Sequence, residues 1–305
     1  MAERRVVSLI ASSTEIACAL GLEDSLVGRS HECDYPNGIL SLPVLTKPKM
    51  DPSKSSAAID ADVKSLLSQA LSIYEVDSIK LKELAPDVIL TQIQCEVCAV
   101  SREDVERALG DWIGARPDIV SLEPNRLVDI WEDVRRVAKA CGIAEKGEEL
   151  VASLDARIAA IRKKTESLPR PTVACIEWIE PLMAAGNWIP ELVDAAGGIN
   201  LFGKVGLHSP WMTLDDLVEK DPDIIVILPC GFDIKRTRSE MPALETKEAW
   251  KGMRAVNEGR VFVTDGNQYF NRPGPRVVES LEIFTEIIHP DVFAPNHHRV
   301  GWEPL

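Results

Sequence analysis

The strongest constraint on the fold is a pattern that occurs twice: a helix, the dipeptide Pro-Asp and a short apolar strand. The first copy covers residues 81–90 (LKELAPDVIL), and the second covers residues 214–225 (LDDLVEKDPDII). A short apolar run bounded by a turn signal is typical of a strand buried on both faces of a parallel sheet. Each strand leads into a cysteine-bearing loop, with Cys95 and Cys98 in the first copy and Cys230 in the second. The duplication predicts an α/β protein built from two similar lobes.

The segments around the two copies also alternate between strand and helix patterns. Further strands are expected at residues 6–10, 26–29, 44–45, 118–120, 172–176 and 261–263, and helices at 12–20, 60–72, 77–85, 127–142 and 275–288. A long helical pattern over residues 144–167 ends at two prolines, and such a helix is stiffer than a flexible linker. We therefore predict an N-terminal α/β lobe over residues 1–143, an interdomain helix over 144–168 and a C-terminal α/β lobe over 169–305.

Composition and charge exclude several classes of partner. The chain has 305 residues, a net charge of −14 and a pI of about 4.9, and such an acidic surface repels nucleic acid and anionic lipid. No apolar run approaches the roughly 18 residues of a membrane helix, so we expect no membrane insertion. The seven cysteines form an odd set without a secreted-scaffold spacing. With no apolar leader before the first strand, these features predict a cytoplasmic protein; a periplasmic protein whose leader has been removed is the alternative.

The loop at residues 91–101 (TQIQCEVCAVS) is the first candidate site, because ligands bind at the carboxyl ends of strands in open α/β sheets. It contains Cys95 and Cys98, and the loop after the strand at 26–29 contains His31 and Cys33. Thiolates and imidazole together suit zinc or another soft metal. We expect His31 or Cys33 to lie close to Cys95 or Cys98, so that this cluster faces the cleft and contacts a ligand or a metal. The alternative is that the cysteines are buried or only line an apolar pocket.

Other polar and aromatic residues lie on predicted loops. Gln92 follows the strand at 88–90, Trp178 follows the strand at 172–176, and His208 precedes the helix at 214–220, where it either contacts ligand or only bonds backbone. Arg272 lies in a loop stiffened by proline and glycine and is a candidate partner for a carboxylate or phosphate on a ligand. Four residues are expected to play no part in binding. They are Cys18, Cys141 and Cys175, assigned to the core, and Arg276, assigned a structural role. The pair His297-His298 is expected in a solvated tail.

Several short motifs together resemble a known family. They are residues 8–15 (SLIASSTE), 34–36 (DYP), 86–89 (PDVI), 197–200 (GGIN), 222–225 (PDII) and 275–276 (PR). In this order they are similar to the class III solute-binding proteins, in particular the cobalamin-binding type that serves ABC importers. The resemblance implies two Rossmann-like lobes joined by a long interdomain helix, with the ligand held in a cleft between them.

The resemblance also implies a ligand and a partner. Family members contact the corrin ring of cobalamin through aromatic residues, and four residues here match those positions by motif. They are Tyr35, Trp178, Tyr269 and Phe270. Trp188 and Trp211 are candidates by location only. The family implies docking to an ABC permease as well. The chain departs from its relatives in residues 47–79, which are longer, and in its His31, Cys33, Cys95 and Cys98 set, which the usual cobalamin pocket lacks.

Three functions remain in competition at this point. The first is a non-enzymatic protein that binds cobalamin or a related corrinoid. The second is an intracellular protein that binds a metal or metallocofactor through the His/Cys set. The third is an enzyme with Cys95 or Cys98 as nucleophile and His31 or His208 as base. No Ser-His-Asp order, phosphate loop or HExxH helix is present to support a defined reaction, so the prediction is a binding protein and not an enzyme.

Overall fold

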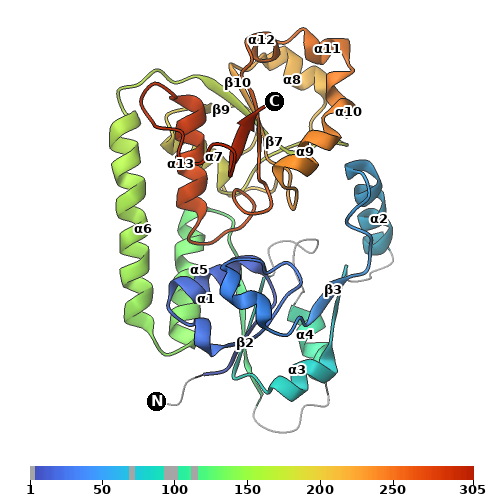
Figure 1. Cartoon of the computed structure of the whole chain (residues 1–305), viewed down its shortest axis with the longest axis vertical. Helices are drawn as coiled ribbons and strands as arrows, with labels where there is room; N and C mark the ends of the chain where they lie inside the picture. Colours follow the sequence, from blue (N-terminus) through green and yellow to red (C-terminus); the bar gives the residue numbers. More distant parts are fainter. Residues whose placement is uncertain (1–3, 69–72, 93–101, 111–115) are drawn as a thin grey trace. The chain divides into compact units, whose positions relative to one another are not determined.

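The computed structural model describes residues 4–68, 73–92, 102–110 and 116–305 (Figure 1). The chain divides into two compact units. Unit 1 comprises Met1–Lys54, Ala61–Pro124 and Val128–Ser153, and unit 2 comprises Ser55–Asp60, Asn125–Leu127 and Leu154–Leu305. Each unit has its own sheet and its own hydrophobic core, as the sequence repeat predicts.

The main sheet of unit 1 has four parallel strands in the order β2-β1-β5-β6. They are β1 (Val6–Ser8), β2 (Leu26–Arg29), β5 (Val88–Gln92) and β6 (Asp118–Leu122). All of β5 is buried because it pairs with β1 on one side and β6 on the other. Because successive side chains of β5 point to opposite faces of the sheet and all of them are buried, the run after the first Pro-Asp is apolar at consecutive positions and not at alternate ones.

Helices lie between the strands of unit 1 and after its last strand, β6. They are α1 (Ala11–Ala19), α3 (Ser78–Leu84), α4 (Arg102–Ala108) and α5 (Leu127–Ala140), with 3-10 turns η1 (Glu23–Ser25) and η2 (Asn37–Ser41). Leu81 of α3 and Val105 of α4 pack with Val7 and Ile89 of the sheet in one buried cluster. The helices therefore bury their apolar stripe against the sheet, as amphipathic helices in α/β folds do.

A second, two-stranded sheet lies in the excursion between β2 and β5. It pairs β3 (Thr46–Pro48) with β4 (Tyr74–Val76) in antiparallel fashion, and α2 (Ser56–Ser68) lies between these strands in the sequence. The short strand predicted near residues 44–45 starts one residue later, at Thr46, whereas Val44 forms only an isolated bridge to Arg29. The predicted helix at 60–72 begins earlier, at Ser56.

The sheet of unit 2 repeats the design of unit 1 and extends it. Its order is β12-β11-β10-β7-β8, with β9 also paired to β7. The strands are β7 (Thr172–Trp178), β8 (Met183–Ala184), β9 (Ile199–Asn200), β10 (Ile224–Ile227), β11 (Val261–Thr264) and β12 (Trp302–Pro304). Strands β7, β10 and β11 are parallel, whereas β8 and β12 run antiparallel to their neighbours. All four residues of β10 are fully buried, as predicted for the second repeat.

Eight further helices complete the described part of the chain. They are α6 (Ala144–Thr165), α7 (Ile189–Ala195), α8 (Leu214–Lys220), α9 (Ile234–Glu240), α10 (Pro242–Glu245), α11 (Glu248–Lys251), α12 (Arg254–Asn257) and α13 (Val277–Ile288). The division between the units falls inside α6, between Ser153 and Leu154. The long helix predicted over 144–167 is confirmed as an element, while its role as a stiff connector stays a prediction. No helix in the described ranges has the length and apolar character that a membrane crossing requires.

Each Pro-Asp dipeptide performs the same structural task in its own unit. Helices α3 and α8 both end at a residue with a left-handed backbone, φ 41° and φ 38°, directly before the proline. The aspartate then accepts a backbone N–H from the start of the neighbouring strand: Arg5 N donates to Asp87 Oδ2 at 2.8 Å, and Thr172 N donates to Asp223 Oδ2 at 2.7 Å. The proline therefore ends the helix, and the aspartate positions the first strand of the unit beside the strand that follows Pro-Asp: β1 beside β5, and β7 beside β10.

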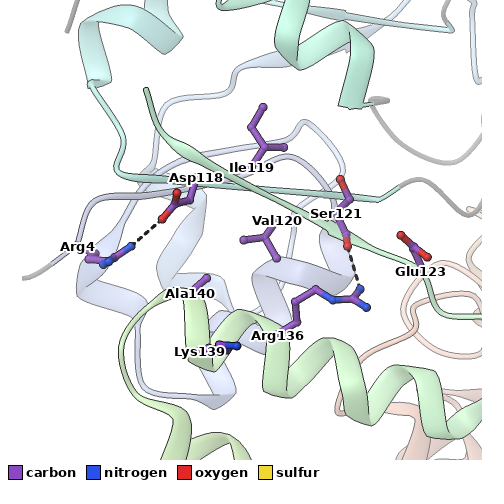
Figure 2. Close-up of a pocket in the computed structure, with 9 residues that line it drawn as sticks. All are labelled: Arg4, Asp118, Ile119, Val120, Ser121, Glu123, Arg136, Lys139 and Ala140. Carbon is purple, nitrogen blue, oxygen red and sulfur yellow. Dashed lines mark hydrogen bonds and ion pairs between the residues drawn. The ribbon is translucent and has the colours of Figure 1, made fainter. Parts of the chain in front are cut away.

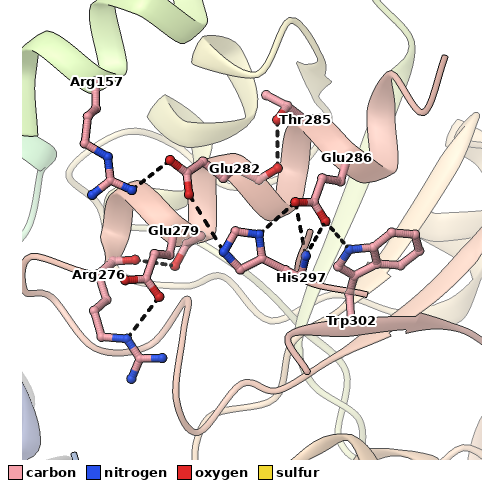
Figure 3. A network of polar contacts seen from close by, with 9 residues as sticks. Arg157, Arg276, Glu279, Glu282, Thr285, Glu286, His297 and Trp302 are labelled. Carbon is pink, nitrogen blue, oxygen red and sulfur yellow. Dashed lines mark hydrogen bonds and ion pairs between the residues drawn. The ribbon is translucent and has the colours of Figure 1, made fainter. Parts of the chain in front are cut away.

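The C-terminal residues after α13 pack against α13 (Figure 3). Buried Glu286 of α13 accepts from Trp302 Nε1 at 2.7 Å and from the backbone N of His297 at 3.1 Å, and it lies 2.7 Å from His297 Nδ1. His297 Nε2 is also 3.7 Å from Glu282, which pairs with Arg157 at 2.7 Å. A buried carboxylate needs such donors because its desolvation is costly. The prediction of a solvated tail is therefore wrong for His297.

The first prediction concerns the second Pro-Asp carboxylate. Burial tends to raise the pKa of Asp223, but hydrogen bonds from Thr172 and the nearby Arg254 and Arg260 outweigh it and hold the pKa below its usual value. Asp223→Asn should lower the free energy of unfolding by about 1–2 kcal/mol near neutral pH. Because the folded-state pKa is lowered, this stability is present above the unfolded pKa of about 4 and is lost as pH falls. Urea unfolding at several pH values measures the effect. Asp291→Asn, an exposed carboxylate after α13, is the control.

The second prediction concerns His297. The hydrogen bond with Glu286 raises the pKa of His297, although burial works against it. A raised folded-state pKa stabilises the fold fully below the unfolded pKa of about 6.5, and the contribution is lost as pH rises through the folded value. His297→Gln should therefore cost about 1–3 kcal/mol near pH 6 and less at about pH 8.5. Unfolding followed by tryptophan fluorescence tests this, with His298→Gln as the control. A pH-independent loss in His297→Gln would contradict the role of its charge.

Candidate functional site

In unit 1, the loop after β2 contains His31, whose contacts include residues of β3 and β4. Thr46 Oγ1 lies 2.7 Å from His31 Nδ1 and accepts His31 N at 3.0 Å, and the Thr46 hydroxyl also bonds Ser30. Tyr74 packs its ring 5.5 Å from the imidazole and donates to Glu32 at 3.1 Å. Burial lowers the pKa of His31, which keeps the ring neutral at physiological pH. Residues of β3 and β4 thus hold this histidine in place.

Cys33 lies in a buried cluster of hydroxyl groups. Thr14 Oγ1 donates to Cys33 Sγ at 3.0 Å, and Thr14 also bonds Ser8, whose hydroxyl is 2.6 Å from that of Ser13. The thiol is buried against β1 and α1. Within the described ranges, no group of three or more His, Cys, Asp or Glu residues is arranged to hold a metal.

The rest of the predicted His/Cys set is not described. Cys95 and Cys98 lie outside the described residues, so the predicted cluster with His31 and Cys33 stays a prediction. The remaining unit 1 candidates differ from each other in exposure. Tyr35 is 43% exposed, whereas Gln92 is buried at the end of β5, 3.5 Å from Ser12 Oγ. Tyr35 is therefore the described candidate of unit 1 that is available at the surface.

In unit 2, residues 205–211 form an exposed loop with a rigid base; we call it the 205–211 loop. Val205, Leu207 and Trp211 are 42%, 57% and 55% exposed, and His208 is exposed between them. Buried Ser209 anchors the loop from below, because its hydroxyl donates to Glu177 Oε2 at 2.8 Å and accepts Gly186 N at 3.0 Å.

Backbone contacts fix the same loop at further points. Asn187 N donates to Leu207 O at 2.7 Å, and Ala184 N donates to Pro210 O at 2.9 Å. Glycine is required at Gly186, because a Cβ there would collide with the carbonyl oxygen of Leu207. The 205–211 loop therefore presents a histidine, a tryptophan and two aliphatic side chains in a fixed arrangement.

Trp178 ends strand β7 and is half-buried. Its Nε1 donates to Ser56 O at 3.3 Å, and its ring lies 5.2 Å from Phe232, over which Arg236 stacks at 4.9 Å. The structure thus places Trp178 in an aromatic group of unit 2 with its indole N–H already bonded.

Four other candidates of unit 2 are buried in the structure. Trp188 donates to Phe270 O at 2.9 Å, Phe270 packs edge-on against Phe284, and Arg276 stacks over Tyr269 at 4.5 Å. Arg272 is 6% exposed and donates to Asn267 at 3.2 Å. These contacts favour packing roles for Trp188, Tyr269, Phe270 and Arg272.

The sequence did not indicate the exposure of Val205 and Leu207, since apolar residues are assigned to the core by default. A signal was present nonetheless: the segment 201–211 contains two glycines and a proline and has neither helical nor strand periodicity.

A separate pocket of about 530 Å³ runs along β6 in unit 1 (Figure 2). Its lining includes Arg4, which pairs with Asp118 at 3.2 Å, and Arg136, which donates to Ser121 O at 3.0 Å. None of the candidate residues that the structure describes lines it.

Comparison with known proteins identifies the family. The family described as "Periplasmic binding protein" matches residues 6–268. An uncharacterized ABC transporter substrate-binding lipoprotein, YvrC of Bacillus subtilis, is 23% identical over 95% of this chain and 81% of its own length. A vitamin B12-binding protein of Vibrio cholerae is 22% identical over 91% of this chain and 86% of its own length.

A solved structure shows the same fold. The periplasmic heme-binding protein RhuT from Roseiflexus sp. RS-1, in its apo form, superposes with a TM-score of 0.68 at 21% identity, covering 95% of this chain and 99% of that one. The architecture is that of the class III periplasmic binding proteins, with a parallel sheet and covering helices in each unit. The chain therefore belongs to the periplasmic binding protein family, whose members bind solutes and are not enzymes.

Proposed function

We propose that this protein is the solute-binding component of an ABC importer and that its ligand is cobalamin or a related metal-centred tetrapyrrole. The observation that carries the proposal is the 205–211 loop, with Val205, Leu207 and Trp211 exposed on a rigid base. A soluble protein rarely exposes adjacent large apolar side chains unless they contact a partner or a ligand. A flat, largely apolar macrocycle matches such a surface, because tryptophan can stack on its face.

Two relatives support the ligand class. One is named a vitamin B12-binding protein and one a heme-binding protein, and both ligands are metal-centred tetrapyrroles. We propose that the loops at the carboxyl ends of the strands form the binding surface in each unit, with Tyr35 of unit 1 and Trp178, His208 and Trp211 of unit 2 in contact with ligand.

The relatives also support a partner and a location. The Bacillus subtilis relative is named as a substrate-binding lipoprotein of an ABC transporter, and we propose a permease as the partner of this chain as well. The same relationship supports a location outside the cytoplasmic membrane in preference to the cytoplasm predicted from the cysteines. The zinc alternative depends on Cys95 and Cys98, and none of the contacts in the described ranges favours it.

The third prediction tests ligand class and site together. Cyanocobalamin, dicyanocobinamide and ferric protoporphyrin are titrated into the protein, with calorimetry and quenching of tryptophan fluorescence as measurements. At least one of them should bind. Trp211→Ala should weaken that ligand by about 1–3 kcal/mol, because a stacked aromatic is a typical binding hot spot.

Ile79→Ala is the matched control for this experiment, because Ile79 is a strongly exposed apolar residue of α3 outside the candidate loops. It should leave the affinity unchanged. Absence of binding by all three compounds contradicts the proposed function. Equal losses in Trp211→Ala and Ile79→Ala would place the ligand elsewhere.

A further inference from the structure

We propose that Glu240 is a positioning residue that orients Trp178 for contact with ligand. It holds the first residue of α2 in place, and the carbonyl oxygen of that residue, Ser56, accepts the indole N–H. Residues 55–60, in the excursion between β2 and β5, are thereby part of the ligand-binding surface of unit 2. The inference rests on the proposed function for the ligand contact of Trp178, and it adds the residue that controls this contact.

The start of α2 is attached to unit 2 by a carboxylate of α9. Ser55–Asp60 belongs to unit 2, although the residues on both sides of it belong to unit 1. Glu240 Oε2 accepts the backbone N–H of Ser56 at 2.9 Å and the hydroxyl of the same residue at 2.9 Å. Ser56 is the first residue of α2, where the backbone N–H has no partner inside the helix and a negative charge is favoured. Because Ser56 is buried, water does not compete for its two donors.

The carboxylate of Glu240 is itself held by a cation. Arg236, one turn earlier on α9, pairs with Glu240 Oε1 at 3.0 Å, while Oε2 accepts the donors of Ser56. The side chain of Glu240 is only 10% exposed, and charges with so little solvent contact are screened less than surface pairs. Both carboxylate oxygens therefore have a partner, and together these partners fix the orientation of the Glu240 side chain.

Ser56 connects Glu240 to Trp178. An indole N–H can only donate, and Nε1 of Trp178 donates to Ser56 O at 3.3 Å. Phe232 is buried with its ring centroid 5.2 Å from that of Trp178, and Arg236 stacks over Phe232 at 4.9 Å. The contacts therefore return to the residue from which they started. In order, the residues in this closed series are Glu240, Ser56, Trp178, Phe232 and Arg236.

The hydrogen bond to Ser56 determines how Trp178 meets a ligand. The one polar atom of its side chain is occupied, while the half-buried ring keeps part of its surface exposed. Trp178 therefore contacts ligand through its ring and not through a hydrogen bond. A side chain that is held in one orientation before binding loses less conformational entropy when the ligand arrives. Loss of the Glu240 carboxylate should release the start of α2 and the indole together, and so weaken binding without removing a group that touches ligand.

The first experiment measures the environment of Trp178 without ligand. The protein is labelled with fluorotryptophan, and the fluorine resonance that disappears in Trp178→Phe is the resonance of Trp178. Glu240→Ala should shift or broaden this resonance and leave the remaining tryptophan resonances near their wild-type positions, which also shows that the variant is folded. Ser56→Ala removes one of the two donors to Glu240 and should give a smaller change in the same direction.

The matched control is Glu245→Ala, because Glu245 is an exposed carboxylate on the neighbouring helix α10. It should leave the Trp178 resonance unchanged. A Trp178 resonance in Glu240→Ala that is identical to that of the wild type would overturn the proposal, because the indole would then keep its position without the carboxylate.

The second experiment tests whether Glu240 affects ligand through Trp178. Trp178→Phe keeps an aromatic ring but has no N–H for Ser56. Affinity for the tightest-binding of cyanocobalamin, dicyanocobinamide and ferric protoporphyrin is measured in the wild type, Glu240→Ala, Trp178→Phe and the double variant. Each single variant should lose about threefold to tenfold in affinity, and the double variant should lose no more than the weaker of the two, because residues that act through one contact are not additive.

The outcomes separate this inference from the proposed function. Losses that simply multiply in the double variant, or an affinity of Glu240→Ala equal to that of the wild type, would overturn the positioning role while leaving the proposed function intact. Binding by none of the three compounds would overturn the proposed function and with it the ligand contact of Trp178. The contact between Ser56 and the indole is judged by the fluorine resonance alone.

Discussion

Both units depend on the hydrogen bond between an aspartate and a backbone N–H at, or directly before, the first residue of the neighbouring strand. Asp87 and Asp223 each follow a proline that ends a helix, and each accepts an N–H beside or at the start of the first strand of its unit. The bond fixes the relative register of two central parallel strands, and the loops at their far ends inherit that register. The position of Trp178 at the end of β7 is therefore set six residues away, at Thr172.

The sequence predicted the elements whose signals are local. The Pro-Asp repeats, the buried strands β5 and β10 and the long helix α6 were all predictable, because proline, apolar runs and helical spacing act over a few residues. Exposure within loops was less predictable. Trp188 and Trp211 both lie on irregular segments, yet one is buried against Phe270 and the other is exposed. That difference depends on contacts with distant residues, which a single sequence does not contain.

The packing of the C-terminal segment was also not predictable from the sequence, because it depends on a residue outside the segment. His297 and its neighbours are polar, so their composition alone favours solvent. The reason they pack lies in Glu286, a carboxylate buried on α13 for which Trp302 and His297 supply the donors. No pattern within residues 290–305 indicates this partner, because Glu286 lies eleven residues before His297 in the sequence. A buried charged residue on an otherwise apolar helix face is the signal to examine in such cases.

The pocket along β6, whose lining includes Arg4, Asp118 and Arg136, affects how the molecule behaves in concentrated solution. Among the described strands, β6 pairs only with β5, so its other edge can template the strand of a second molecule. Arg136 already donates a hydrogen bond to the Ser121 carbonyl of β6, and Asp118 of the same strand forms an ion pair with Arg4. A foreign strand would have to break these contacts and bury their charges. The edge is thereby protected against intermolecular β-pairing, which favours a protein that stays dispersed at high concentration.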